Sequence, residues 1–434
     1  MAQNRVSPSA LKSGGMEYNR LTNRRISTKQ VICISKSGLL PGVRVLDIGQ
    51  GISGPYCAMI LANLGAEVIK VEPLDGDEAR RMGRFPGDVP HLEKSGLFLS
   101  LNANKRGVTL DLDSPADARR FMSLIEGTDI VVDNGPGGRL EELGLGYGAM
   151  RQANPEIILA SITPFGDRGP YAKFLATDLV LFHMSGHAHN LLGPVEDPQT
   201  TPPVRAGDHQ AERVAGLSAA TASLMALYRK RMTGLGCHVV VSSFEAMATQ
   251  LISGLAGCAY GQPPPARSLP QQRAAAAKGL VGAIGGVLPC ADGFVAISPR
   301  EDAQWARWLE VMGNPKWATD ERYATRKARQ ANSEALWDLL GQWSKRYSKY
   351  EIARMGQARR IPCFPVNTVE DLLNSEQLQE REFFVEVDHR MAGRLMYPGV
   401  AYRLSDAELP LGRLPAPRLG EHNDSILSGN SKPT

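Results

Sequence analysis

A switch of hydrophobic pattern from strand to helix and back most strongly restricts how this chain can fold. The segment GVRVLDIG (42–49) has the β-branched composition of a buried strand, and EVIKVEP (67–73) has the same character. Between them, GISGPYCAMILANLGA (51–66) has the apolar spacing and the length of a helix. A strand, a helix and a second strand in this order form a βαβ unit, whose two strands lie parallel. The chain is therefore expected to be an α/β protein.

The alternation continues after this first unit. Further strands are expected at 107–113, 129–134 and 156–166, with a helix at 115–126. Ligands of such parallel sheets bind beyond the carboxyl ends of the strands. A pocket is therefore expected at the loops that follow four strands, after Gly49, Pro73, Asn134 and Thr163. The glycines of GISGP do not form a GxGxxG pattern, so an NAD site is not expected.

The second half of the chain has a different organisation. A helix at 213–230 and a strand at 238–244 precede a Pro/Ala-rich stretch, 261–279, which is typical of an exposed linker. A hairpin at 281–298 and amphipathic helices at 302–355 follow. Four segments are expected: a basic disordered extension at 1–39, the first part of a large domain at 40–225, a linker with a small inserted domain at 226–345, and at 346–434 a return to the large domain with a disordered tail.

The net charge of +4 over 434 residues conceals an uneven distribution. Residues 1–40 hold seven Lys or Arg and one acidic residue, a local charge of +6, so the remainder carries −2. Nothing outside the basic segment predicts a nucleic-acid surface. A disordered extension is the simplest interpretation of that segment. There are two alternatives: the segment is a transit peptide, or the true start of the protein is Met16 and the first codon is placed upstream of it.

Membrane insertion and disulfide bonding are not expected. No apolar run approaches the roughly 20 residues that span a bilayer. The six cysteines are scattered without a CxxC pair, which favours free thiols in a reducing compartment and a cytoplasmic location.

Six strings, in one order, resemble the family III CoA transferases, the carnitine and formyl-CoA transferase-like enzymes that also include α-methylacyl-CoA racemase. They are VRVLDIGQGISGPYCAMILANLGAEVIKVEP, LNANKRGVTLDL, LEELGLGY, NPEIILASITPFGDRGPY, AGLSAATASLMALYRKRMTGLG and IPCFPVNTVEDLL, spread between Leu40 and Leu404. The resemblance implies a Rossmann-like large domain built from both ends of the chain, with a smaller α+β domain inserted. It also implies a homodimer of two interlocked rings.

The same resemblance points to a nucleophile. The family places an aspartate four residues before a glycine and fourteen before an Ala-Leu pair. Here Gly216 and Ala226–Leu227 stand at those distances from Glu212. The family's carboxylate attacks an acyl-CoA thioester to form a mixed anhydride, passes through an enzyme-bound CoA thioester, and hands CoA to an acceptor acid. Glu212 is therefore the expected catalytic residue of a CoA transferase.

A glutamate differs from the family's aspartate by one methylene. The functional group is the same, so covalent catalysis remains chemically available. The extra bond moves the carboxylate by about 1.5 Å, and displacements near 1 Å can cost roughly a hundredfold in rate. The alternative is an acidic residue in the first turn of a helix, favoured by the helix dipole and paired with Arg213. Asp208 is a possible substitute carboxylate, and His209 a possible assisting residue.

The resemblance also implies contacts to CoA. They are assigned to Asn104, Lys105 and Arg106 in NKRG, and to Arg139 in the loop after the fourth strand. Lys and Arg suit a polyanionic ligand, although a solvated turn would have the same composition. Pro136 and Glu142 stand where the family commonly has Arg or Lys, so the CoA site departs from the usual pattern.

An acyl pocket is implied by four further residues. They are Phe165 and Arg168 in TPFGDRGPY, and Gly285 and Gly286 in GAIGGV, which resembles the family's mobile glycine loop. An ordinary hairpin is the alternative for the two glycines. Racemases of the family use a histidine in a Gly-His-Asp string, and this chain has ATDLV with Thr177 at that position. Racemisation is therefore not expected.

Other polar clusters are set aside. His183, His187 and His189 resemble a metal cluster, but Gly186 interrupts their helix, and no metal is expected. Cys363 is expected to be a small buried residue. No permanently bound cofactor is expected: CoA is a co-substrate, and the partners are acyl-CoA, a carboxylic acid and a second copy of the chain. The alternative function is a non-transferring acyl-CoA or acid-binding protein, or a lyase or isomerase, on the same fold.

Overall fold

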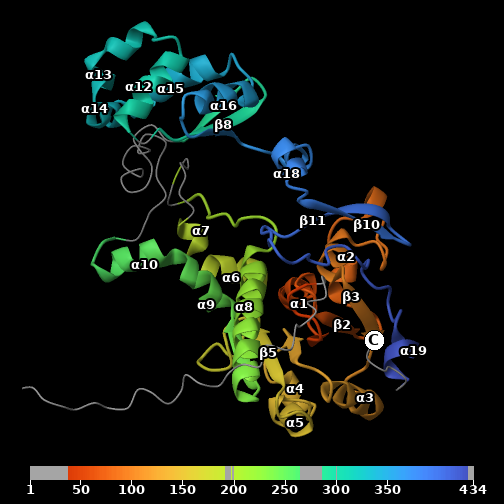
Figure 1. Cartoon of the computed structure of the whole chain (residues 1–434). Coiled ribbons are helices and arrows are strands. Elements are labelled where there is room, and N and C mark those ends of the chain that lie inside the picture. Colours follow the sequence, from red (N-terminus) through yellow and green to blue (C-terminus); the bar gives the residue numbers. More distant parts are fainter. Residues whose placement is uncertain (1–37, 191–196, 198–199, 264–285, 300, 429–434) are drawn as a thin grey trace, which may run out of the picture. The chain divides into compact units, whose positions relative to one another are not determined.

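The computed structural model describes residues 38–190, 197, 200–263, 286–299 and 301–428 (Figure 1). Residues 1–37 of the basic segment expected at 1–39, most of the linker expected at 261–279 and the tail after Gly429 lie outside the described residues. Among the described residues, no helix is both long and apolar enough to cross a membrane.

A six-stranded, wholly parallel sheet forms the largest element of the structure. Its strands stand in the order β3-β2-β1-β4-β5-β6, and every neighbouring pair is parallel. The strands are β1 Arg44–Asp47, β2 Glu67–Glu72, β3 Lys105–Thr109, β4 Ile130–Asp133, β5 Ile158–Thr163 and β6 Cys237–Ser242. This is the order of a doubly wound sheet, in which successive strands are added first on one side of β1 and then, from β4 on, on its other side. The predicted α/β class is confirmed.

Helices pack against both faces of this sheet because its central strands β1, β4 and β5 are buried on both sides. On one face, α1 (Ser53–Asn63) and α8 (Gln210–Thr233) bury small side chains against alternate residues of β1, β4 and β5. On the other face, α3 (Pro115–Ile125) and α5 (Tyr147–Ala153) cover the intervening residues. The shorter helices around the sheet are α2 Gly96–Asn102, α4 Arg139–Glu142, α6 Asp178–Met184, α7 His187–Asn190, α9 Ser243–Ala248 and α10 Ile252–Ala259, and the 3₁₀ helices η1 Glu78–Arg81, η2 Pro86–Asp88 and η3 Thr249–Leu251.

A second core lies later in the chain, around the three-stranded antiparallel sheet β7-β8-β9. Trp308 is fully buried in it, together with Leu288 and Val295 from the strands. The elements are β7 Gly286–Cys290, β8 Gly293–Ile297, β9 Cys363–Pro365, α12 Asp302–Val311, η5 Lys316–Thr319, α13 Glu321–Ala324, α14 Arg326–Ala331, α15 Ser333–Ser344 and α16 Lys349–Ala358. The hairpin predicted at 281–298 is thus present over its described residues.

The end of the chain returns to the parallel sheet. After α17 (Val369–Leu373) and α18 (Glu376–Glu380), the hairpin β10 (Phe384–His389) and β11 (Gly393–Pro398) packs against α2 through Val387 and Tyr397. The last described helix, α19 (Asn423–Leu427), lies beside β3, where the Asn423 side chain accepts a hydrogen bond of 2.9 Å from the Thr109 amide.

The domain division expected from the sequence stays a prediction, but two of its boundaries cut through packed elements. The boundary at 225/226 falls inside α8, and β6 beyond it pairs with β5 in the parallel sheet. The boundary at 345/346 separates α15 from Ile352 and Ile361, which share its core. The packing therefore favours a small domain that begins after α10 and ends near β9.

Gly216 permits the close crossing of α1 and α8. A Cβ at this position would lie 2.5 Å from the carbonyl oxygen of Ser53 and 3.1 Å from the ring of Tyr56. Because the first contact is backbone, a side chain can be fitted only by moving one helix. The glycine four residues after Glu212 is thus explained by packing.

We expect Gly216→Ala to lower the free energy of unfolding by about 1–3 kcal/mol through this overpacking. Gly148→Ala, in α5 with nothing within 4 Å of the new Cβ, is the matched control and should be neutral or slightly stabilising. Urea unfolding measures both variants. Equal stability of the two would show that the helices do not cross this closely.

Candidate active site at the start of α8

The turn that leads into α8 has an unusual backbone. Asp208 and His209 both adopt the left-handed conformation, with φ of 67° and 54°. This conformation costs free energy in non-glycine residues and concentrates at functional sites. His209 is the N-cap residue, yet its side chain caps no backbone N–H. The helix is instead capped from another part of the chain.

Asp178, the first residue of α6, supplies that cap. Its Oδ1 accepts hydrogen bonds from the amides of Ala211 at 2.8 Å and Glu212 at 3.3 Å, and its Oδ2 pairs with Arg205 at 2.8 Å. A buried carboxylate at a helix N-terminus satisfies free N–H groups and matches the helix dipole. Asp178 therefore fixes the position of the first turn of α8 and of the Glu212 backbone within it.

The Glu212 side chain is held by its neighbour one turn earlier. His209 Nδ1 lies 3.0 Å from Glu212 Oε2, and the two side chains are 28% and 30% exposed for Glu212 and His209 respectively. The remaining oxygen, Oε1, has no partner among the described residues. Glu212 therefore presents one oriented oxygen that can reach a bound molecule.

Burial raises the pKa of the Glu212 carboxyl above its ordinary value. The His209 hydrogen bond and charge act in the opposite direction, while the negative charges of Asp178 and Glu78 raise the pKa further. Desolvation together with nearby like charge is the combination that marks functional carboxylates. Glu212 is thus a carboxylate whose basicity and nucleophilicity exceed those of an exposed glutamate.

The pH dependence follows from these directions. If the ionised form of Glu212 is the reactive one, activity falls as pH drops through the raised pKa. His209→Gly removes the hydrogen bond that lowers this pKa while preserving the left-handed backbone, so the acid limb of the rate profile should move to higher pH. His91→Ala, in an exposed turn, is the control. An unmoved limb would show that His209 does not act on the reacting carboxyl.

The alternative partners expected around Glu212 are arranged differently. Arg213 pairs with Asp208, its Nη2 lying 3.3 Å from the Asp208 carboxylate, and not with Glu212. Asp208 itself is 72% exposed. The pairing of Glu212 with Arg213, considered as part of the alternative, is therefore wrong, and Asp208 is the more solvated of the two carboxylates.

Phe165 lies near this turn, and Arg168 does not face it. The Phe165 ring packs against Tyr171 and Phe244 in an apolar cluster that includes Ala211, the residue before Glu212. An apolar wall therefore lies beside the candidate nucleophile, and the acyl-pocket role of Phe165 stays a prediction. The side chain of Arg168 is 91% exposed and lies 3.8 Å from the Asp167 carboxylate, so the structure gives it no pocket contact.

Lys105 does not have the environment expected of a phosphate ligand. Its ammonium is fully buried and bonds to Asp47 Oδ2 at 2.8 Å, to the Pro55 carbonyl at 2.9 Å and to Asn102 Oδ1 at 2.9 Å. The alternative considered for NKRG, a solvated turn before a strand, does not hold for Lys105 either, because β3 already begins at this residue. Lys105 therefore anchors the sheet below the β1 loop.

The same buried network includes a second lysine. Lys70 in β2 pairs with Asp77 at 2.6 Å and bonds to the carbonyl of Gly49 in the β1 loop. Asp77 Oδ1 in turn accepts the amide of Gly51 at 2.8 Å. Although burial disfavours the ammonium, Asp47 and Asp77 hold the pKa of Lys70 above its ordinary value. Burial is the dominant effect at Lys105, whose pKa it lowers to about 8.

Asn104 and Arg106 lie at the opposite edge of the sheet from Glu212. Asn104 joins the sheet to the C-terminal segment, because its side chain bonds to Asn63 and to the carbonyl of Pro410. Arg106 pairs with Glu67 at 3.0 Å. Both line a cavity of about 820 Å³ at the amino ends of β1 and β2, whereas α8 begins beyond the carboxyl ends. The expectation that NKRG contacts a ligand bound at Glu212 does not fit this placement.

Arg139 lines a cavity of about 440 Å³ beyond the carboxyl ends of β1 to β4, where the strand order reverses. This is the position predicted for a ligand pocket from the strand pattern. Gln50 from the β1 loop and Pro136 from the β4 loop also line it. Arg139 forms an ion pair with Asp113 on the same rim.

The two glycines assigned to a mobile loop are only partly described. Gly285 lies outside the described residues. Gly286 is the first residue of β7, and a Cβ there would lie 2.6 Å from the ring of Trp337. Its absent side chain is therefore explained by hairpin packing, the alternative considered from the sequence.

The polar clusters set aside from the sequence have structural partners. His187 bonds to the Met247 carbonyl at 2.9 Å and His183 to that of Leu179 at 2.8 Å. Among the described residues, ligand atoms of Asp178, His209 and Glu212 lie within 4.8 Å of one another, a spacing that can hold a metal ion. Both oxygens of Asp178 are already bonded, however, which fits helix capping better than metal ligation.

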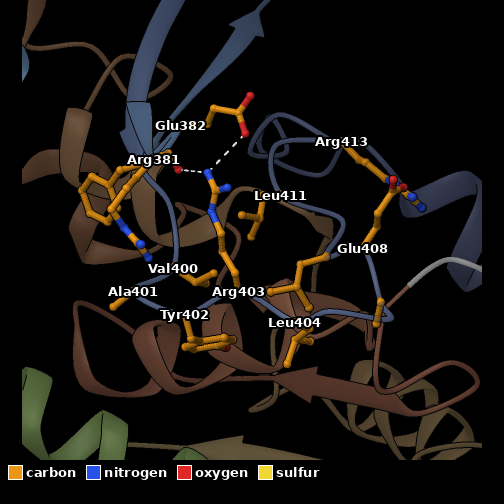
Figure 2. Close-up of a pocket in the computed structure, with 13 residues that line it drawn as sticks. Arg381, Glu382, Val400, Ala401, Tyr402, Arg403, Leu404, Glu408, Leu411 and Arg413 are labelled. Carbon is orange, nitrogen blue, oxygen red and sulfur yellow. Dashed lines mark hydrogen bonds and ion pairs between the residues drawn. The ribbon is translucent and has the colours of Figure 1, made fainter. Parts of the chain in front are cut away.

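A further cavity, of about 450 Å³, lies in the returning C-terminal segment (Figure 2). Arg403 bonds there to the Arg381 carbonyl and to Glu382, and Tyr402 and Leu404 line the same hollow. None of the residues assigned to catalysis or CoA binding from the sequence lines it. We therefore place the candidate nucleophile at the start of α8 and the candidate ligand pocket at the cavity lined by Arg139.

Sequence reasoning missed two residues of the site. Asp178 stands in the ATDLV string that was considered only for the histidine it lacks, and 33 positions separate it from the Ala211 amide that it caps. Glu78, whose charge acts on Glu212, packs against the β1 loop: a Cβ on Gly51 would lie 2.4 Å from Glu78 Oε1. The one signal available in the sequence was the presence of an aspartate, Asp178, in ATDLV.

Comparison with known proteins assigns a family to this fold and site. The sequence pattern of CoA-transferase family III matches residues 40–423. The chain belongs to this family. It is 33% identical over 396 residues to the succinyl-CoA:(R)-benzylsuccinate CoA-transferase subunit BbsE of Thauera aromatica, covering 88% of this chain and 92% of that protein. It is 30% identical to the succinate–glutarate CoA-transferase of Agrobacterium fabrum, covering 90% and 95% respectively.

A solved structure supports the assignment. The CAIB/BAIF family protein of Brucella suis superposes with a TM-score of 0.78 at 28% identity, covering 89% of this chain and 98% of that one. The chain is thus a family III CoA-transferase by sequence and fold. Enzymes named among its relatives transfer CoA between an acyl-CoA and a carboxylic acid.

Proposed function

We propose that this chain transfers CoA between an acyl-CoA donor and a carboxylic acid acceptor, with Glu212 as the covalent nucleophile. The observation that carries the proposal is the setting of Glu212: His209 holds one carboxylate oxygen, the other has no partner among the described residues, and burial raises the pKa of the carboxyl. Ground-state desolvation of a carboxylate strengthens it as a nucleophile.

The proposed reaction passes through two covalent intermediates on Glu212, a mixed anhydride and a CoA thioester. Glu212 Oε1 attacks the thioester carbonyl, CoA thiolate leaves, and a mixed anhydride of Glu212 and the acyl group forms. The thiolate then attacks the glutamyl carbonyl, which releases the donor acid as its carboxylate and leaves a glutamyl-CoA thioester. The acceptor carboxylate attacks that thioester, and the same two steps in reverse give the new acyl-CoA and free Glu212. No proton is gained or lost overall.

The surrounding residues have roles that follow from their contacts. His209 donates to Oε2 and so keeps Oε1 turned toward the thioester. Asp178 fixes the first turn of α8, whose positive end stabilises charge on the reacting oxygens. Phe165 and its aromatic neighbours supply an apolar wall for the acyl group. CoA is a substrate throughout, and no resident cofactor is needed for these steps.

The donor in the first assay should be succinyl-CoA. The relatives from Thauera aromatica and Chloroflexus aurantiacus carry succinyl-CoA in their names, and the acceptors named are dicarboxylic acids such as glutarate and L-malate. We extend to this chain a dicarboxylic acyl group as donor and a dicarboxylic acid as acceptor.

We also propose a dimer, with the inserted small domain and interlocked rings expected from the family resemblance. The outer face of α8 supports an interface, because Leu217, Met225, Tyr228 and Met232 are each more than half exposed in the isolated chain. Monomers rarely expose an apolar patch of this extent along one helix.

A second candidate function is a subunit that binds an acyl-CoA or its acid without transferring CoA. The extra methylene of Glu212 favours it, since it displaces the carboxylate from the position that an aspartate would reach. Three of the relatives are named as subunits of CoA-transferases. This candidate predicts acyl-CoA binding without covalent labelling.

Trapping the covalent intermediate distinguishes the two candidates. The protein is mixed with succinyl-CoA and then with hydroxylamine, which cleaves an anhydride or thioester and leaves a hydroxamate. Mass spectrometry should find that modification on the peptide that bears Glu212. If succinyl-CoA raises the melting temperature but labels no peptide, the non-transferring candidate is correct.

A further inference from the structure

The cavity beyond the carboxyl ends of β1 to β4 has an unexpected charge. The cavity has a volume of about 440 Å³. Its lining carries the carboxylates of Asp75, Asp111, Asp113 and Asp133 and a single cation, Arg139. A further acid on the wall, Glu72, is neutralised from behind by the buried Arg80. A site that holds a polyphosphate normally presents more cations than anions.

The one lining arginine is already occupied. Arg139 Nη2 bonds to Asp113 Oδ1, and the two side chains remain 43% and 63% exposed. Asp75 pairs with Arg81 outside the cavity at 2.9 Å. No cation is paired in this way with Asp111 or Asp133 among the described residues. The rim thus offers an entering phosphate two unpaired carboxylates and an arginine that is bound elsewhere.

Asp133 adds a negative charge to the lining of the same cavity. It ends β4, its Oδ1 accepts the amide of Gly135 at 2.8 Å, and burial raises its pKa to about 6. At neutral pH it is therefore mostly ionised and repels a phosphate in the same cavity. The cavity is, by contrast, open to an uncharged chain: Ile48, Leu110 and Leu143 line its apolar part.

We propose that Asp113 withholds Arg139 from the ligand, so that this cavity accepts the uncharged pantetheine arm of an acyl thioester and gains no affinity from the phosphates of CoA. The inference rests on the proposed function only in placing a thioester at this cavity. It adds that the enzyme discriminates weakly between CoA, dephospho-CoA and pantetheine, and that Asp113 determines this selectivity. Salt should also fail to weaken CoA binding to the wild type, because it screens the repulsion between the phosphates and the unpaired carboxylates.

The test compares three unreactive ligands on the wild type, two single variants and one double variant. Wild type, Asp113→Asn and the control Asp388→Asn, an exposed acid on β10, are titrated with CoA, dephospho-CoA and pantetheine by calorimetry at low and moderate salt. Wild type and control should bind the three ligands within about threefold of one another. Asp113→Asn frees Arg139 and should bind CoA roughly tenfold more tightly, a gain near 1.4 kcal/mol, with pantetheine unchanged. The gain should be lost on adding Arg139→Gln and should shrink with salt.

Each result decides the inference separately from the catalytic proposal, because no ligand in the titration can react. Wild-type protein that binds CoA more than tenfold more tightly than pantetheine overturns it, as does an Asp113→Asn variant without gain. Absence of binding by every ligand to every protein also overturns it, since the cavity would then not hold the thioester arm. The Glu212 trapping experiment fails or succeeds independently of all these outcomes.

Discussion

Glu212→Gln is expected to lower the rate of CoA transfer by more than about a thousandfold while leaving the fold intact. The amide has the shape of the carboxylate but cannot attack a thioester, so no mixed anhydride forms. The backbone N–H of residue 212 still donates to the Asp178 carboxylate, so the start of the helix is preserved. Succinyl-CoA to glutarate transfer, followed by separation of the acyl-CoA products, measures the loss. Glu310→Gln, exposed on α12, is the control.

Glu212→Asp tests whether the extra methylene is an adaptation. If the site is built around glutamate, the shorter side chain withdraws from the thioester and from His209, and the rate should fall by roughly a hundredfold. The fall should be smaller than that of Glu212→Gln, because a carboxylate remains. A faster Asp variant would show that the scaffold still fits aspartate, and transfer by the Gln variant would exclude Glu212 as the nucleophile.

The parallel sheet was predictable because its signal is local. Each strand is a short apolar run bounded by turn residues, and the switch to helical spacing between β1 and β2 admits only a crossover connection. The position of Glu212 was predictable for a similar reason, since its distances to Gly216 and Ala226 lie within one helix.

The partners of charged side chains were not predictable in the same way. Lys105 reads as surface charge in the sequence, but its carboxylate partner, Asp47, lies 58 positions earlier. Arg139 is 26 positions from Asp113, which occupies it. Pattern reasoning assigns a charge to an element. Only the packed sheet shows whether that charge faces a ligand or another side chain.

The buried charges below the β1 loop yield the second large effect. Asp47→Asn should lower the free energy of unfolding by about 3–5 kcal/mol, because it leaves the fully buried Lys105 ammonium without its carboxylate. The cost should be reduced in the double variant Asp47→Asn with Lys105→Met, which removes the unpaired charge together with its partner. Urea unfolding of the four proteins gives the coupling energy between the two sites.

The same network should also respond to alkaline pH in wild-type protein. Burial lowers the folded-state pKa of Lys105 to about 8 from an ordinary value near 10.5. Between these two values the unfolded chain binds more protons at this site than the folded chain, so this lysine alone makes stability rise with pH across that window. Lys105→Met should remove that contribution. If the pH slope is unchanged by Lys105→Met, and if the Asn variant is as stable as wild type, the ammonium is not held in the buried pair with Asp47, whose other oxygen accepts the Gly49 amide.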